Sequence, residues 1–164
     1  MASPGRPSSQ QESAGLLMHR HRAGRLQVLL AHPGGPYFRN KDADVWTLPK
    51  GEIEPGDDLL ATARREFREE TGHDPAGPFL ALGSIRQRGG KVVHAWACAG
   101  DLDDAAAPPS NLFEIEWPPA SGRRQEFPEI DRVAWLEMDD ARRRINPAQV
   151  TLLDRLVERL RSPA

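Results

Sequence analysis

The chain has little cysteine and no long apolar run. Of its 164 residues one is cysteine, Cys98. One cysteine excludes a disulfide within the chain and fits a reducing compartment, so we expect a cytoplasmic protein. Because Cys98 lies in an apolar segment with no Cys/His array upstream, we expect it to belong to the core. No apolar run approaches the length of a membrane span, so we expect no membrane partner.

The chain also lacks a basic surplus and an export signal. Its formal net charge is -2, which does not favour nucleic acid as a partner. The first residues, MASPGRPSSQQES, contain no apolar segment of the kind that a secretory signal needs. Their composition is typical of disorder, and the length of the chain fits one domain. We therefore expect a disordered tail over 1–12 and a single domain over 13–164, as a monomer or a homodimer.

Apolar segments and turn signals predict mixed strands and helices. The segments 14–19 and 26–31 are typical of an early hairpin, and 79–86 and 92–99 of a second hairpin around Gly89-Gly90. Alternation predicts further strands at 111–117 and 132–136. Helices are expected at 138–143 and 147–160. The inner face of the second is expected to carry five apolar residues, Leu152, Leu153, Leu156, Val157 and Leu160.

An acidic helix between these strands is the most informative segment. Gly56 interrupts the chain before it, and Asp57 or Asp58 can act as its N-cap. Gly72 is expected to end it in the left-handed conformation. Between these ends an apolar stripe repeats with helical spacing, formed by Leu59, Leu60, Ala63 and Phe67.

Three carboxylates lie on this helix, and two of them flank its apolar stripe. With about 100° per residue, Glu66 and Glu70 fall beside Leu59, whereas Glu69 lies further round. A buried charge is costly unless it is paired or bound to metal, and oxygen ligands favour Mg²⁺ or Mn²⁺. The competing interpretation is a solvated helix whose Glu and Arg side chains pair with each other.

The spacing around these carboxylates resembles a known motif. From Gly51 the chain reads G-x5-D-x7-R-E-F-R-E-E-T-G-H. It is similar to the Nudix box, G-x5-E-x7-R-E-U-x-E-E-x-G-U, where U is bulky and apolar. Two positions depart from the box, Asp57 for the first Glu and His73 for the last apolar residue. The resemblance implies a Nudix α/β/α sandwich with a mixed β-sheet (α+β or α/β), over about Ser13 to Leu160.

The resemblance also implies a hydrolase with a metal cofactor. Nudix hydrolases hold Mg²⁺ or Mn²⁺ against a diphosphate linked to a nucleoside. Carried over, the metal ligands are Glu66, Glu69 and Glu70, and the carbonyl of Lys50 or Gly51 is a further candidate. Arg65 is expected to support catalysis by pairing with Asp57, which would hold the loop against the helix.

The general base is expected outside the box. In many family members it lies on a loop before a late strand that carries a Trp. The segment FPEIDRVAWLEM matches this pattern, and Glu129 stands six residues before Trp135. Glu129 is therefore our candidate for the base or for a further metal ligand. Glu126 and Glu69 are the alternatives.

The lead-in to the box suggests a substrate. WTLPKGEIEPGDD resembles the asymmetric diadenosine tetraphosphate hydrolases, and Lys50 and Lys91 are candidates for phosphate contacts. Lys91 stands where that branch commonly has a stacking Tyr. The rings that can stack a base instead are those of Tyr37, Phe38, Phe113 and Trp117. The alternatives are a MutT-like nucleoside triphosphate pyrophosphohydrolase and a catalytically silent, nucleotide-binding regulatory domain.

Overall fold

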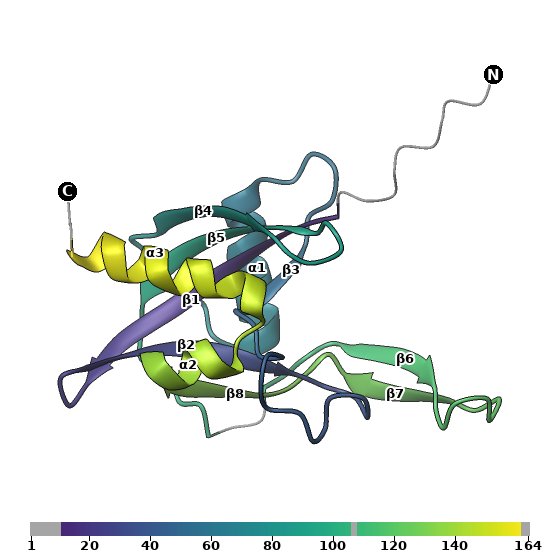
Figure 1. Ribbon diagram of the computed structural model, residues 1–164. Helices are drawn as coiled ribbons and strands as arrows, with labels where there is room; N and C mark the ends of the chain where they lie inside the picture. Colours follow the sequence, from purple (N-terminus) through teal and green to yellow (C-terminus); the bar gives the residue numbers. More distant parts are fainter. Residues whose placement is uncertain (1–10, 106–107, 162–164) are drawn as a thin grey trace.

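A mixed six-stranded sheet forms the centre of the protein, whose computed structural model describes residues 11–105 and 108–161 (Figure 1). The strand order is β4-β5-β1-β2-β8, and β3 pairs with β1. These strands are β1 (Glu12–Arg22), β2 (Arg25–Pro33), β3 (Lys50–Glu52), β4 (Leu80–Arg86), β5 (Val92–Ala99) and β8 (Ile130–Glu137). Strand β1 runs parallel to β5 and antiparallel to β2 and β3, so the sheet is mixed.

One edge of β1 is shared by two strands. Its C-terminal half pairs with β2 and its N-terminal end with β3, where Gly15 lies opposite Lys50. A Cβ on Gly15 would stand 2.6 Å from the Pro49 carbonyl oxygen and 2.7 Å from the Lys50 Cβ. Only glycine therefore lets β3 approach β1 this closely. The division places the box loop beside the middle of the sheet.

Helices cover both faces of this sheet. Helix α1 (Leu59–Thr71) packs Ala63 and Phe67 against Leu16 and Leu29 of the sheet. On the other face lie α2 (Met138–Arg144), a 3₁₀ turn (Pro147–Gln149) and α3 (Val150–Arg161). Figure 1 shows α2 and α3 on the side of the sheet away from α1. The predicted α/β/α sandwich is confirmed.

A second, two-stranded sheet projects from the body of the domain (Figure 1). Here β6 (Leu112–Glu116) pairs with β7 (Arg124–Pro128), from Leu112 opposite Pro128 to Glu116 opposite Arg124. We call this pair the ribbon. The sequence indicated β6 but not β7, whose residues RQEFP show no alternation of apolar and polar side chains.

Most of the predicted elements are present. Both hairpins are confirmed, and the final helix is divided into the 3₁₀ turn and α3. Strand β1 begins at Glu12, inside the tail predicted over 1–12, while residues 1–10 lie outside the described part. Cys98 is buried in the core as expected, and burial raises the pKa of its thiol to about 11.

Candidate active site

The loop between β3 and α1 is closed by two neighbouring aspartates with different tasks. Asp57 accepts a hydrogen bond from the Glu54 amide at 3.2 Å, which closes the Gly/Pro-rich turn. Asp58 accepts from the Ala61 amide at 2.8 Å and is therefore the N-cap of α1. At the other end Gly72 adopts φ 76°, so the predicted left-handed C-cap is confirmed.

Glu70 is the most buried carboxylate of the helix, with 6% of its surface exposed. Burial, followed by repulsion from Glu66, raises the pKa of Glu70 to about 8. The positive charge of Lys50 opposes this shift and lowers the pKa of Glu70. The ammonium of Lys50 is itself buried, and burial followed by repulsion from Lys91 lowers its pKa to about 8. The structure thus places Lys50 beside Glu70, with Lys91 as a neighbour of Lys50.

Glu66 packs directly against Gly51. A Cβ on Gly51 would overlap the Glu66 carboxyl group, so no larger residue fits there without moving this side chain. Burial raises the pKa of Glu66, and Glu69 and Glu129 raise it further by repulsion, while Arg65 opposes the shift. The first glycine of the box therefore makes room for a carboxylate of the helix.

The expected bridge between Arg65 and Asp57 is wrong. The Arg65 guanidinium lies 3.5 Å from Glu66 and 3.9 Å from Glu69, and among the described residues it makes no ion pair with Asp57. Since the Asp57 carboxylate already binds the Glu54 amide, its shorter side chain closes its own turn instead. Arg65 partly neutralises the carboxylates of its own helix.

Glu129 is brought to the box by backbone contacts at the base of the ribbon. Its carbonyl accepts a hydrogen bond from the Gly34 amide at 2.8 Å, and its own amide donates to the Asn111 carbonyl at 2.8 Å. The residue is exposed, yet partial burial of its carboxyl raises the pKa, and repulsion from Glu52 and Glu69 adds to this shift.

The two alternatives to Glu129 are placed differently. Glu126 is exposed in β7, opposite Glu114, and is not among the charges that act on Glu66, Glu70 or Glu129. Glu69 belongs to the cluster. Glu52 was missed from the sequence, although its position directly after Gly51 was a usable signal.

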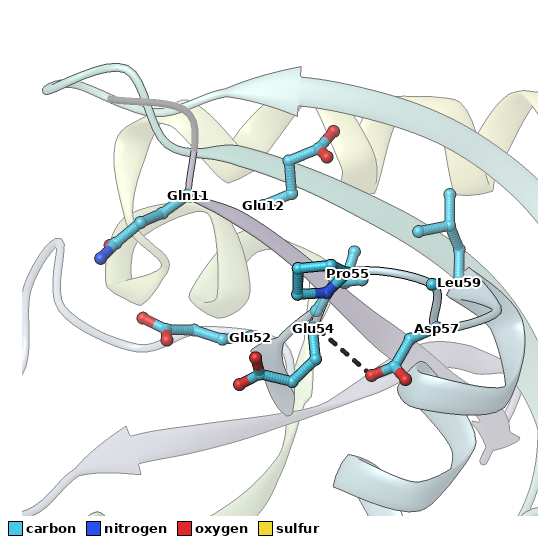
Figure 2. Close-up of a pocket in the computed structure, with 9 residues that line it drawn as sticks. Gln11, Glu12, Glu52, Glu54, Pro55, Asp57 and Leu59 are labelled. Atoms are coloured by element: carbon cyan, nitrogen blue, oxygen red, sulfur yellow. Dashed lines mark hydrogen bonds between the residues drawn. The ribbon is translucent and has the colours of Figure 1, made fainter. Parts of the chain in front are cut away.

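A cleft of about 470 Å³ lies on the side of the box loop (Figure 2). Its lining includes Glu12, Glu52, Glu54 and Asp57. In Figure 2 the carboxylates of Glu52 and Glu54 extend to the same side of the loop. Because the lining is rich in carboxylates, this cleft does not suit a bare phosphate chain.

The donor chemistry of the cluster fits a hard divalent cation. Glu66, Glu69, Glu70 and Glu129 supply only carboxylate oxygens, which are ligands of Mg²⁺ and Mn²⁺. Three of them have pKa values raised by burial and mutual repulsion, so a positive charge is favoured among them. Within residues 11–105 and 108–161, no three such side chains are grouped closely enough to hold an ion as placed.

Tyr37 lies apart from this cluster. It belongs to the loop between β2 and β3, and its ring makes an edge contact with Trp117 at the end of β6, with centroids 5.2 Å apart. Of the three predicted substrate contacts, the structure therefore brings Lys50 and Lys91 together, with Lys50 beside Glu70, and places Tyr37 in a loop that contacts the ribbon.

The fold and the carboxylate-bearing loop-helix define an α/β/α sandwich built around a Nudix box. The family model of the NUDIX domain matches residues 10–156, and the chain belongs to this family. The family predicted from the sequence is thereby confirmed.

Curated relatives match short parts of the chain. It is 37% identical over 59 residues to the asymmetrical bis(5'-nucleosyl)-tetraphosphatase of Caenorhabditis elegans, covering 36% of this chain and 38% of that protein. It is 48% identical over 50 residues to nucleoside diphosphate-linked moiety X motif 6 of Mus musculus, covering 30% of this chain and 15% of that protein. An RNA pyrophosphohydrolase of Caulobacter vibrioides is 38% identical over 61 residues, covering 34% and 36%. These matches thus span less than two fifths of each relative.

Solved structures match nearly the whole chain. The NUDIX domain of Shewanella oneidensis NrtR, complexed with ADP ribose, has a TM-score of 0.65 at 18% identity, covering 97% of this chain and 94% of that one. A binary complex of the C. elegans Ap4A hydrolase has a TM-score of 0.63 at 23% identity, covering 91% and 98%. At these identities the likeness establishes the fold alone. In the described part of the chain no helix has the length and apolar character needed to cross a membrane.

Proposed function

We propose that the chain is a Mg²⁺-dependent hydrolase that cleaves a phosphoanhydride in a nucleoside diphosphate-linked substrate. The observation that carries this proposal is the cluster of Glu66, Glu69, Glu70 and Glu129 beside Lys50, which has Lys91 as its neighbour. A helix that only covers a sheet has no need of buried carboxylates, which cost free energy there.

The lysines complement the substrate, and the carboxylates complement a cation. Lys50 and Lys91 are close enough for each to affect the other, so together they form a positive site for phosphate oxygens. Glu66, Glu69 and Glu70 would hold the metal, to which the Gly51 carbonyl is a further candidate ligand. When bound, Mg²⁺ or Mn²⁺ neutralises charge on the diphosphate and orients the attacking water.

Glu129 is our candidate for the general base. The backbone amide and carbonyl of Glu129 are both hydrogen-bonded, so the position of this residue beside the cluster is well defined. Its raised pKa brings the carboxylate closer to the range in which it accepts a proton from water efficiently. Glu69 remains the competing base within the cluster. Arg65 orients Glu66 and Glu69 through its contacts at 3.5 and 3.9 Å.

A dinucleoside polyphosphate such as diadenosine tetraphosphate is the substrate that we favour. The match to the C. elegans tetraphosphatase supports this choice. A nucleoside triphosphate, cleaved as by MutT-like enzymes, is the alternative.

The proposal is tested by product analysis with diadenosine polyphosphates, nucleoside triphosphates and nucleotide sugars, with and without Mg²⁺. We expect Mg²⁺-dependent cleavage, fastest with diadenosine tetraphosphate, and loss of cleavage in the Glu70→Gln variant. If no compound is cleaved while nucleotides still raise the melting temperature, the chain is a nucleotide-binding regulatory domain instead. Equal activity of wild type and Glu70→Gln would refute the metal site.

A further inference from the structure

A buried histidine joins β2 to the segment that carries Glu129. His32 is fully buried, with 0% of its surface exposed. Its Nε2 lies 2.6 Å from the Lys41 carbonyl oxygen, and its Nδ1 lies 2.9 Å from a carboxylate oxygen of Asp131. Because a carbonyl oxygen can only accept, Nε2 donates to Lys41, and a second hydrogen bond joins Nδ1 to Asp131. The ring therefore links the loop after β2 to a residue two positions beyond Glu129.

Asp131 is the extra residue of a β-bulge. His32 pairs with Arg132, and Pro33 pairs with Ile130, so β8 has one residue more than β2 over this step. An extra residue of this kind is left without a partner in the ladder, and it changes the direction of the side chains beside it. The hydrogen bond from His32 therefore holds the one residue of the bulge that the backbone ladder does not.

The bulge decides which side chains of β8 face helix α1. Ile130, Val133 and Trp135 are all buried in the cluster that packs against α1. Val133 and Trp135 have the two-residue spacing of a regular strand, whereas Ile130 lies three residues before Val133 and would face the other way without the bulge. The direction of the chain before Asp131, including that of Glu129, thus depends on this extra residue.

The stretch 32–34 holds the Glu129 segment at two points. The Gly34 amide donates to the Glu129 carbonyl at 2.8 Å. A Cβ on Gly34 would stand 1.9 Å from the Pro128 carbonyl oxygen, so the two backbones are in close contact there. The His32 ring supplies the second point, at Asp131. Two points of attachment fix the direction of a short segment, whereas one would leave it free to turn.

A second cation approaches Asp131 from the solvent side. The Arg132 guanidinium lies 3.6 Å from the Asp131 carboxylate, but its side chain is 49% exposed. Exposed ion pairs contribute little to stability. The buried His32 ring is therefore the partner that fixes the Asp131 side chain.

A general base requires an accurate position. Regular pairing without the bulge would shift Glu129 along the strand by one residue, which is about 3.3 Å. The base must lie within hydrogen-bond reach of the attacking water, and a misplacement of about 1 Å can cost about 10²-fold in rate. Partial relaxation of the bulge is thus enough to lower turnover.

We propose that His32 is a positioning residue for the hydrolysis. By binding Asp131 in the bulge, it holds Glu129 in the orientation in which the carboxylate reaches the attacking water. This inference rests on the proposed function, because it takes Glu129 as the base. It assigns no contact with substrate to His32.

Two substitutions of His32 separate its two hydrogen bonds. In His32→Asn the amide nitrogen takes the place of Nδ1 and keeps a donor for Asp131, whereas in His32→Gln it takes the place of Nε2 and keeps a donor for Lys41. Both variants lose the edge contact of the ring with Trp46 at 5.0 Å, so both should be less stable than wild type.

The kinetics of the two variants should differ. With diadenosine tetraphosphate and Mg²⁺, we expect kcat to fall about 10- to 100-fold in His32→Gln and to stay within about threefold of wild type in His32→Asn. KM should change less than about threefold in both, because the substrate contacts are kept. Equal kcat values in the two variants, or the reverse order, would overturn the positioning role.

A double-mutant cycle shows whether His32 acts through Glu129. In a Glu129→Gln background the base is absent, so His32→Gln should lower kcat less than about threefold further. An equal fall in both backgrounds would contradict the proposal.

Two control variants alter neighbouring features of the sheet. His19→Gln changes another buried histidine, which lies in β1 opposite Val28. Arg132→Gln removes the exposed partner of Asp131. Both should keep kcat near the wild-type value. A fall in either as large as in His32→Gln would show a general effect on the sheet and would overturn the assignment.

Hydrogen exchange separates this result from a failure of the proposed function. The Gly34 amide, which donates to Glu129, is a probe of the segment that NMR can follow without substrate. Its protection should fall at least about tenfold in His32→Gln and stay near wild type in His32→Asn. If the wild type cleaves nothing, or Glu129→Gln keeps full kcat, the hydrolase or its base is wrong, and this exchange still tests His32. Unchanged protection in His32→Gln would refute its hold on the segment.

Discussion

Helices α1 and α3 cover opposite faces of one sheet with different inner surfaces. Helix α3 turns Leu152, Leu153 and Leu156 to the sheet, all at most 1% exposed. Helix α1 turns Phe67 inward together with Glu70, which is 6% exposed. Leucines suffice to seal a sheet of this size, so the buried carboxylate of α1 serves another purpose. The proposed function accounts for this difference: α3 stabilises the fold, whereas α1 gives up stability for the proposed metal site.

The largest expected effect on stability lies in α3. Leu153→Ala removes a fully buried side chain and should lower the free energy of unfolding by about 2–5 kcal/mol, because it leaves a cavity between helix and sheet. Urea denaturation measures this change. At temperatures where the variant remains folded, kcat should stay near the wild-type value. A strong loss of kcat in folded Leu153→Ala would contradict the assignment of α3 to stability alone.

Substitution of the α1 carboxylates should lower kcat without lowering stability, the reverse of the effect expected for Leu153→Ala. Glu66→Gln and Glu70→Gln each remove a charge from the proposed metal site, and loss of one such contact commonly costs about 3–4 kcal/mol of barrier. We expect kcat to fall by roughly 10²- to 10³-fold with Mg²⁺, measured by product formation. The melting temperature of each variant should be equal to or above that of the wild type, because the cost of burying an ionisable carboxyl group is removed.

The Gly51→Ala variant tests the contact between the box loop and helix α1. The added Cβ overlaps the Glu66 carboxyl, so we expect a destabilisation of about 1–3 kcal/mol and a loss of turnover. Urea denaturation measures the stability, and product formation with Mg²⁺ measures the turnover. A double-mutant cycle provides the control, since Gly51→Ala should cost much less stability in a Glu66→Ala background. Equal costs in both backgrounds would show that the glycine acts through its backbone instead.

The two helices should also differ in their response to pH. The pKa of Glu70 is about 8 in the folded chain and about 4.5 when unfolded, so between these values the folded state binds more protons. Its contribution therefore makes stability fall as pH rises from 4.5 to 8, by at most about 1.4 kcal/mol per pH unit.

Glu70→Gln should reduce this slope strongly, measured by urea denaturation with a chelator at several pH values. A smaller slope should remain, because the pKa values of Glu66 and Glu129 are also raised. Glu158→Gln, which alters an exposed carboxylate of α3, is the matched control and should leave the slope unchanged. An unchanged slope in Glu70→Gln would show that other groups cause it.

The smallest expected effect concerns the helix caps. Asp58→Ala removes the acceptor for the Ala61 amide and should cost about 1 kcal/mol of stability. Asn146→Ala, which removes the acceptor for the Ala148 amide before α3, should cost about the same. Thermal denaturation of both variants compares them. The kcat should remain close to wild type in each, and a large fall for Asp58→Ala alone would assign this cap to the site.

The sequence predicted the sandwich and the box because both depend on local patterns. Spacing and punctuation by Gly56 and Gly72 locate α1, and the same helical period places Glu70 inside its apolar stripe. Strand β7 was missed because its residues have no pattern of their own and pair only with β6. A segment that becomes a strand only by pairing with another strand cannot be recognised from its own residues.

The other features that the sequence did not predict depend on the path of the chain and on contacts between distant segments. The Arg65 partner was predicted wrongly because Asp57 satisfies a neighbouring amide, which depends on the exact path of the turn. Glu52 joins the cluster only because β3 lies beside β1 and faces the Glu129 loop. Leu102, in the connection that follows β5, is buried at 3%, and its carbonyl accepts a hydrogen bond from the Trp135 indole, a contact between segments more than 30 residues apart.

The ribbon also has a consequence for solubility. Because β6 and β7 pair only with each other, each has an outer edge with backbone groups open to a foreign strand. The side chains of Glu114, Glu116, Arg124 and Glu126 are exposed along it, and β7 ends at Pro128. Charge and proline oppose strand addition, which would have to bury these groups. The protein can thus extend a two-stranded arm from its domain without exposing an edge that readily accepts a foreign strand.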